Sequence, residues 1–203
     1  MKEKESRGEK AEATRRQLIE SAHRLFGRRG YSNVSLNEIV EASGVTKGAL
    51  YHHFPGGKKD LMEAVYEQVE SDFSQMIANE ILPTLGGGEI EPLDVMEQAI
   101  GVTLDASLDP ELQQIVLIDA PSVLGWKRWR EIADEHSLGL VKGLLAAGNQ
   151  SGSMRPLPTD TLANLLMAAL SQSMLMVGQA RDKEAAKEEA AETMKALVDG
   201  LRT

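Results

Sequence analysis

Cysteine is absent from the 203-residue chain, which excludes disulfide bonds and thiol chemistry and is compatible with a reducing cytosol. We find no apolar run that approaches the roughly 20 residues needed to span a bilayer. Residues 1–17 are charged throughout and lack the apolar stretch of a signal peptide. We therefore expect a soluble, cytoplasmic protein with no membrane partner.

Motifs that mark enzymes are missing as well. The chain contains no HExxH, P-loop or GxSxG pattern. Three of its four histidines, His23, His52 and His53, lie in the first 60 residues. Asp134 and His136 are two positions apart, so a helix would not place them on one face. We therefore expect no enzymatic activity, no cofactor and no metal site.

The net charge of −9 is distributed unevenly along the chain. Residues 1–60 carry 12 Lys and Arg against 8 Asp and Glu, a net charge of +4, and residues 61–203 carry the remaining −13. A basic end can bind phosphates, while an acidic remainder would repel DNA and favour one docking orientation. Simple solubility explains the acidic part equally well.

Residues 30–61 predict two short helices joined by a tight turn. Ser35 and Glu38 have the spacing of a capping box, in which the hydroxyl accepts from a backbone N–H and the carboxylate reaches back. Gly44 ends the first helix, because glycine adopts a positive φ without a Cβ penalty. Val45 is the single apolar residue of the turn and fills the gap between the helices. Thr46 caps the second helix.

Such a pair forms a helix-turn-helix, whose second helix enters the major groove of DNA. With Leu50 facing inward, the outward positions offer cationic donors, hydroxyls and a close backbone approach. The candidate DNA-binding residues are Ser35, Thr46, Lys47, Gly48, Tyr51, His52, Lys58 and Lys59. An ordinary pair of packed helices with a solvated face is the alternative.

The stretch resembles the DNA-binding region of TetR-family transcriptional regulators. The matching features are Gly30-Tyr31, Ser35, Ile39, Ala42, Gly44-Val45, Thr46-Lys47-Gly48, Leu50-Tyr51, His53-Phe54, Lys58 and Leu61. Ser35 departs from the threonine more frequent in the family but keeps the hydroxyl. The Gly56-Gly57 pair lengthens the connection, which leaves open whether Lys58 or Lys59 reaches the DNA backbone.

The chain as a whole predicts an all-α fold of about nine helices. We expect a disordered charged tail over residues 1–10, a three-helix helix-turn-helix domain over 11–58 and a helical ligand-binding and dimerisation domain over 59–203. A long helix starting near Lys59 would link the two domains. We expect a later helix to start at Asp109 and break near Pro121.

The segment 162–178 is apolar almost all round, and a helix of that kind is buried on every side. In a domain this small, a second copy of the chain would cover part of it, in a four-helix interface with the last helix. A monomer with a well-packed core is the alternative. The candidate interface residues are Leu166, Leu170, Met174, Ala190, Met194, Leu197 and Leu201.

The resemblance also implies that a small molecule binds in the second domain and changes the spacing of two DNA-binding units. Ligand pockets combine apolar walls with a few placed polar groups. The candidate ligand-binding residues are Asp119, Trp126, Trp129, His136, Gln172 and Met174. His136 fits a core histidine better, and the Met-rich helix fits core or interface.

We therefore expect a ligand-responsive homodimer that binds a palindromic double-stranded DNA operator and acts as a repressor released by a small-molecule effector. The sequence leaves two alternatives open. One is an all-helical small-molecule-binding protein or enzyme without a DNA function, and the other is a helical adaptor that binds a protein.

Overall fold

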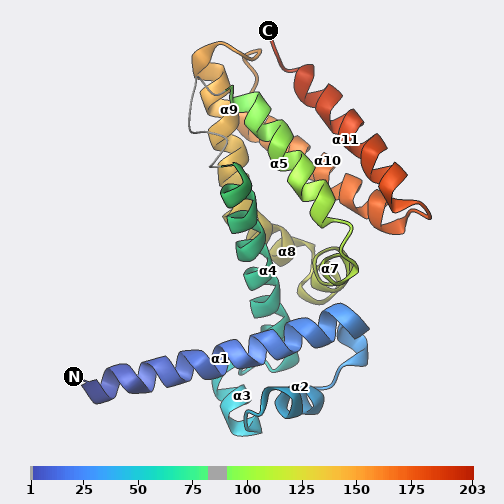
Figure 1. The fold of residues 1–203 in the computed structure, drawn as a ribbon. Helices are drawn as coiled ribbons and strands as arrows, with labels where there is room; N and C mark the ends of the chain where they lie inside the picture. The colour runs from blue at the N-terminus through green and yellow to red at the C-terminus, as the bar shows by residue number, and fades with distance from the viewer. Residues whose placement is uncertain (1, 82–90) are drawn as a thin grey trace. The chain divides into compact units, whose positions relative to one another are not determined.

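A computed structural model describes residues 2–81 and 91–203, with the side chains of residues 8–80 and 91–203. The described chain is helical, as predicted, and its single extended pairing is the isolated bridge between Met154 and Arg202. Figure 1 shows the helices, whose bounds are α1 Lys2–Arg29, α2 Leu36–Ser43, α3 Lys47–His53, α4 Lys58–Ile81, α5 Pro92–Ala106, α6 Pro110–Gln113, α7 Ala120–Leu124, α8 Trp126–Ala133, α9 Gly139–Ser151, α10 Thr159–Gln179 and α11 Lys183–Asp199.

The chain divides into two compact units. Unit 1 comprises residues 1–69 and 110–129, and unit 2 comprises residues 70–109 and 130–203. The boundary expected between residues 58 and 59 differs from this division in two ways. The first half of α4 belongs to unit 1, and the segment 110–129 returns to unit 1 from a distant part of the sequence.

The first helix is longer than expected, because α1 begins at Lys2 and replaces the disordered tail predicted over residues 1–10. Most residues between 2 and 17 are Glu, Lys, Arg or Ala, which are strong helix formers, and this stretch contains no proline. High local propensity therefore extends the helix beyond its apolar part. Figure 1 shows α1 continuing past α3 toward the N-terminus.

Unit 1 has its core between α1 and the two short helices. Leu18, Ala22 and Phe26 of α1 are completely buried, as are Ile39 of α2 and Leu50 of α3. This confirms the prediction that the apolar face of the first helix packs under the helix-turn-helix and completes a three-helix arrangement. The first half of α4 adds Leu61 and Met62 to the buried side chains.

The region from residue 110 to residue 151 departs from the simple helix predicted to start at Asp109 and break near Pro121. A π-helical turn over Gln114–Asp119 separates α6 from α7, and a second one over Asp134–Leu138 separates α8 from α9. Pro121 does not break the helix, because it lies in the first turn of α7, where proline is tolerated. The chain turns instead at Gly125, which has a φ of 82°.

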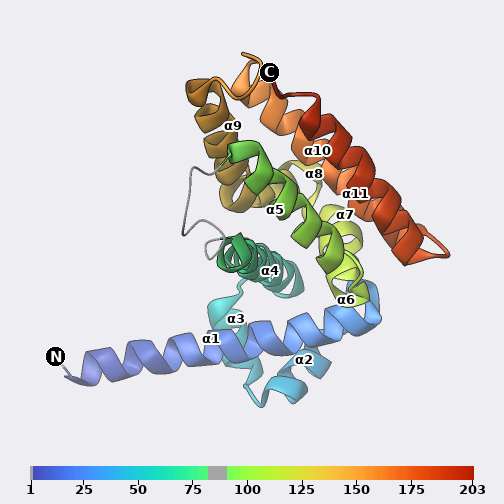
Figure 2. The same ribbon diagram turned by 45° about the horizontal axis from the view of Figure 1, so that its top comes forward.

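Unit 2 is a bundle in which α5, α9, α10 and α11 pack side by side (Figure 2). Its fully buried side chains include Leu93, Leu145, Ala163 and Val198. The end of the chain is held to α5 by the Arg202 guanidinium, which binds Glu97 at 2.6 Å and Asp94 at 2.7 Å.

Helix α10 bears on two expectations. It is long and apolar enough to cross a membrane by length and composition, so the expectation that no segment approaches that length is wrong. Within one copy of the chain only 17% of its most apolar window is buried, so burial on every side would require the second copy that the sequence pattern predicts. Leu165 and Met176 are 63% and 60% exposed.

Candidate nucleic-acid interface

The capping box that starts α2 has the predicted geometry. The Ser35 hydroxyl accepts the backbone N–H of Glu38 at 3.3 Å, and the Ser35 N–H donates to the Glu38 carboxylate at 2.8 Å. Arg29 also donates to this carboxylate, at 2.7 Å. The Ser35 hydroxyl donates to the same carboxylate at 2.7 Å. The three bonds to the carboxylate, with the one from the Ser35 backbone contributing most, lower the pKa of Glu38 to about 2. The box fixes where α2 begins.

The turn between α2 and α3 is also built as predicted. Gly44 adopts the left-handed conformation with a φ of 67°, and the side chain of Val45, next in the turn, is half-buried. The Thr46 hydroxyl accepts the backbone N–H of Ala49 at 3.2 Å and so caps α3. The register of α3 relative to the turn follows from these local contacts.

Helix α3 presents a polar surface because Leu50 is buried on its opposite side. The structure brings together the five candidate residues of this helix and its cap, all of them exposed: Thr46, Lys47, Gly48, Tyr51 and His52. The Tyr51 side chain is 51% exposed. A Cβ atom at Gly48 would meet nothing within 4 Å, so the helix surface is open at this point.

The two lysines at the start of α4 differ in environment. Lys58 is half-buried, with its Nζ 4.0 Å from the centre of the Tyr31 ring. Burial lowers the pKa of Lys58, and the Asp119 and Glu38 carboxylates oppose this shift. Lys59 is exposed to solvent. Of the two lysines, Lys59 therefore has the side chain that is more accessible to a phosphate.

The candidate ligand-binding residues are divided between the units. In unit 1, Trp129 is buried and its Nε1 donates to the Val116 carbonyl at 2.9 Å, while Trp126 is 69% exposed. Asp119 is also in unit 1, where its carboxylate accepts the Tyr31 N–H at 2.7 Å. The three other candidates lie in unit 2: His136 is half-buried, Gln172 is exposed and Met174 is buried. The structure does not bring the six residues together within either unit.

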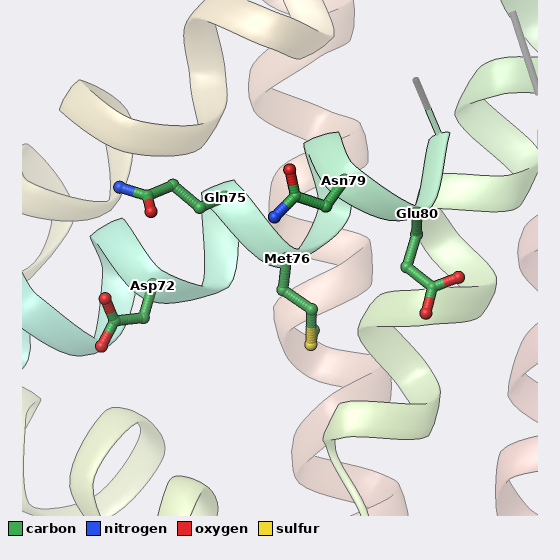
Figure 3. A pocket seen from close by; sticks show the side chains of 5 residues that line it. All are labelled: Asp72, Gln75, Met76, Asn79 and Glu80. Carbon is green, nitrogen blue, oxygen red and sulfur yellow. The ribbon is translucent and has the colours of Figure 1, made fainter. Parts of the chain in front are cut away.

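A shallow depression of about 700 Å³ lies along α4 in unit 2. Its lining consists of Asp72, Gln75, Met76, Asn79 and Glu80, and Figure 3 shows their side chains projecting from this single helix. None of these residues was among the candidates. Four of the five are polar, so apolar periodicity, which selects core positions, does not single them out.

The candidate dimer residues occupy different positions on α10 and α11. Leu166, Met174, Met194 and Leu201 lie in the core of unit 2 and offer little surface to a second copy. Leu170 and Ala190 are half-buried, and Leu197 is 50% exposed. The residues of α10 are apolar around most of its circumference. The sequence pattern therefore did not distinguish its core face from its exposed face.

In the part of the chain that the structure describes, no group of three or more His, Asp or Glu side chains is placed to hold a metal ion. The Asp134 carboxylate is engaged in an ion pair with Arg130 at 2.8 Å. The described residues therefore contain no candidate metal centre, and the exposed surface of α3 remains the strongest candidate site.

Comparison with known proteins matches both parts of the chain to family models. Residues 18–65 match the bacterial regulatory proteins of the tetR family, and residues 93–201 match the tetracyclin repressor-like C-terminal domain. The first match covers α2 and α3, the C-terminal part of α1 and the start of α4. The second covers more than half of the chain.

Individual relatives agree with these matches. The Transposon Tn10 TetC protein of Escherichia coli is 30% identical over 166 residues, which cover 82% of this chain and 81% of that protein. The HTH-type transcriptional regulator AcrR of Shigella flexneri is 31% identical over 109 residues, about half of either chain. A TetR-family transcriptional regulator of Pectobacterium atrosepticum has a similar structure, with a TM-score of 0.79, 27% identity and 96% of each chain covered. The chain therefore belongs to the TetR family of ligand-responsive, DNA-binding transcriptional regulators.

Proposed function

We propose that this TetR-family regulator is a repressor that binds a palindromic operator through the exposed face of α3. The observation that carries the proposal is the surface formed by Thr46, Lys47, Gly48, Tyr51 and His52. It offers a cation, hydroxyls and an imidazole on a helix that is capped at its start and anchored by the buried Leu50. Side chains of these types donate to base edges and phosphates in a major groove.

Phosphate contacts are proposed for Ser35, Lys58 and Lys59, with Lys59 as the principal one. Lys59 is exposed, whereas Lys58 lies against the Tyr31 ring. The Ser35 hydroxyl donates to Glu38 at 2.7 Å. Ser35 and Lys58 would therefore have to exchange a partner within the chain for a phosphate, which Lys59 does not need to do.

The test is a selection of duplexes from a random library with the purified full chain, followed by gel shift at several salt concentrations. We expect an enriched inverted repeat whose affinity falls as salt rises. Tyr51→Ala should weaken binding to that repeat at least fivefold while leaving the oligomeric state unchanged. Leu140→Ala, an exposed truncation on α9, is the control. Salt-insensitive or unselective binding by the wild-type chain would refute the proposal.

We further propose that two copies of the chain associate through α10 and α11. The exposed apolar side chains on these helices are Leu165, Met176 and Leu197, and helices α10 and α11 lie side by side (Figure 2). A second copy would cover this face, and a two-fold dimer matches the symmetry of a palindrome. The face proposed here is shifted from the candidates predicted from the sequence.

Sedimentation of the wild-type chain and of a Leu165→Glu/Met176→Glu variant tests this interface. We expect a dimer for the wild type and a monomer for the variant, because association would bury two unpaired carboxylates in each copy. Leu140→Glu places one such carboxylate on an exposed apolar position of α9 and should remain dimeric. A doubly substituted chain that stays dimeric refutes the assignment of this face.

We also propose that a small molecule bound to unit 2 releases the repressor from its operator in the cytoplasm. The depression along α4 is lined by one helix face, whereas ligand sites surround most of the ligand with apolar walls. We therefore do not assign the effector to it. A thermal-shift screen of the full chain, followed by gel shift with each hit, tests the proposal. Hits that stabilise the chain without weakening the operator complex would count against it.

A further inference from the structure

The segment 110–119 packs against the end of α1 and the turn that follows it within unit 1, although the contacting residues are more than 80 positions apart in sequence. Gly27 permits a close approach, because a Cβ there would be 2.9 Å from the Glu111 Cβ. At Gly30, which has a φ of 76°, a Cβ would be 3.2 Å from the Gln114 side-chain nitrogen. The backbone of α1 and its C-terminal turn is thus shaped to receive this segment.

Asp119 makes the buried polar contact of this packing. Its side chain is 8% exposed, and Oδ2 accepts the Tyr31 backbone N–H at 2.7 Å. Tyr31 begins the 3₁₀ turn that connects α1 to α2, and the first N–H groups of such a turn have no partner within it. A carboxylate acceptor supplies that partner and so holds the turn in place.

The π-helical turn over Gln114–Asp119 determines where the Asp119 carboxylate lies. Ile115 and Val116 are buried in this turn, and the Val116 carbonyl accepts the Trp129 Nε1–H at 2.9 Å. Trp129 is in turn linked to α4, because its backbone carbonyl accepts the Tyr66 hydroxyl at 3.4 Å. The carboxylate is therefore presented from an anchored segment, not from a free loop.

The turn that Asp119 holds sets the start of α2. The Arg29 guanidinium donates to the Asn33 carbonyl at 2.9 Å, and Asn33 donates back to the Arg29 carbonyl at 2.8 Å. Ser35, two residues later, opens the capping box of α2. Any change in the position of the Tyr31 amide therefore reaches α2 and α3 within a few residues.

We propose that Asp119 is a positioning residue for operator binding, which acts by holding the Tyr31 amide and with it the turn from which α2 and α3 start. This inference rests on the operator binding proposed above and deepens it. It gives Asp119 a role in DNA binding in place of the ligand contact expected from the sequence.

Three variants of the full chain separate positioning from general stability. Asp119→Ala removes the acceptor, Asp119→Asn keeps an acceptor oxygen but removes the charge, and Ile118→Ala truncates an exposed neighbour in the same π-helical turn. For each we would measure the melting temperature, the affinity for the selected duplex well below that temperature, and hydrogen exchange of the Tyr31 amide. The exchange measurement needs no DNA.

We expect Asp119→Ala to bind the duplex about tenfold or more weakly and to accelerate exchange at Tyr31, since a hydrogen bond to a charged acceptor is lost. Asp119→Asn should recover most of the duplex affinity and most of the protection of the Tyr31 amide from exchange. Ile118→Ala should match the wild type in both measurements. An Asp119→Ala chain with a lower melting temperature but unchanged affinity overturns the proposal, as does an Asp119→Asn chain as weak as Asp119→Ala. A wild-type chain that enriches no duplex refutes the proposed function itself, whereas failure of the Asp119 assignment leaves wild-type binding intact.

Discussion

Two glycines four positions apart in the helix-turn-helix predict opposite effects when each is replaced by alanine. Gly44 has a φ of 67°, whereas Gly48 lies inside α3 with a helical backbone. A Cβ would meet nothing within 4 Å at either position. Steric crowding by neighbours is therefore equal, and backbone conformation alone decides the change in stability.

Gly44→Ala should lower the free energy of unfolding. A left-handed conformation costs a residue with a Cβ roughly 1–2 kcal/mol. The reduced freedom of the unfolded chain returns about 0.4–1 kcal/mol, so the net loss should be about 1 kcal/mol. Gly48→Ala should raise the free energy of unfolding by roughly 0.5–1 kcal/mol, because alanine is the better helix former.

For operator binding, we expect the stabilised Gly48→Ala variant to be the impaired one and the destabilised Gly44→Ala variant to be unaffected. Gly48 is part of the exposed face of α3, and a methyl group there would hold the helix away from the DNA, so Gly48→Ala should bind the selected duplex several-fold more weakly. Gly44→Ala should bind with wild-type affinity once the chain is folded. Urea unfolding at a fixed protein concentration, together with gel shift, measures both quantities.

Either of two results would refute this reasoning. A Gly44→Ala chain as stable as the wild type would mean that the turn does not need a positive φ. A Gly48→Ala chain that binds the duplex with full affinity would mean that the backbone of α3 does not approach DNA closely at this point.

Three further predictions concern single side chains. The pKa of Glu38 is lowered from an ordinary 4.5 to about 2, so the stability that its carboxylate contributes is complete above pH 4.5 and is lost as the pH falls toward 2. The difference in melting temperature between wild type and Glu38→Gln should therefore shrink between pH 4.5 and pH 2 and stay constant above pH 4.5. Lys59→Ala should reduce the salt dependence of operator binding by about one phosphate contact per subunit, while Lys127→Ala, which removes another exposed lysine, should leave it unchanged. Phe26→Ala should lower the free energy of unfolding by roughly 3–5 kcal/mol, because the ring is completely buried; a loss below 1 kcal/mol in urea unfolding would contradict its place in the core.

The contacts that build the helix-turn-helix were predictable because they are local. Ser35 and Glu38 are three residues apart, and so are Thr46 and Ala49, and each pair is joined by a side chain to a backbone N–H. The positive φ of Gly44 likewise depends on the turn itself. Apolar periodicity then separated the buried Leu50 from the exposed residues around it.

Predictions failed where more than one arrangement satisfied the same pattern. Helix α10 is apolar on most of its circumference, so periodicity could not distinguish the buried Leu166 from the exposed Leu165. The first residues of the chain combine high charge with high helix propensity, and charge suggested disorder where propensity produced the start of α1. Pro121 was predicted to end a helix, but it lies in the first turn of α7, where proline is tolerated.

The amino-acid sequence alone determined the class of the protein, the caps and turn of its helix-turn-helix and the residues exposed on α3, because each depends on neighbours within one or two helical turns. Only the tertiary structure placed the segment 110–129 in the same unit as these helices. It also placed the Asp119 carboxylate at the Tyr31 amide and the Lys58 ammonium over the Tyr31 ring. These contacts join residues 27 to 88 positions apart, and no local pattern specifies which distant side chain will fill a given space. The packing of the whole unit decided them.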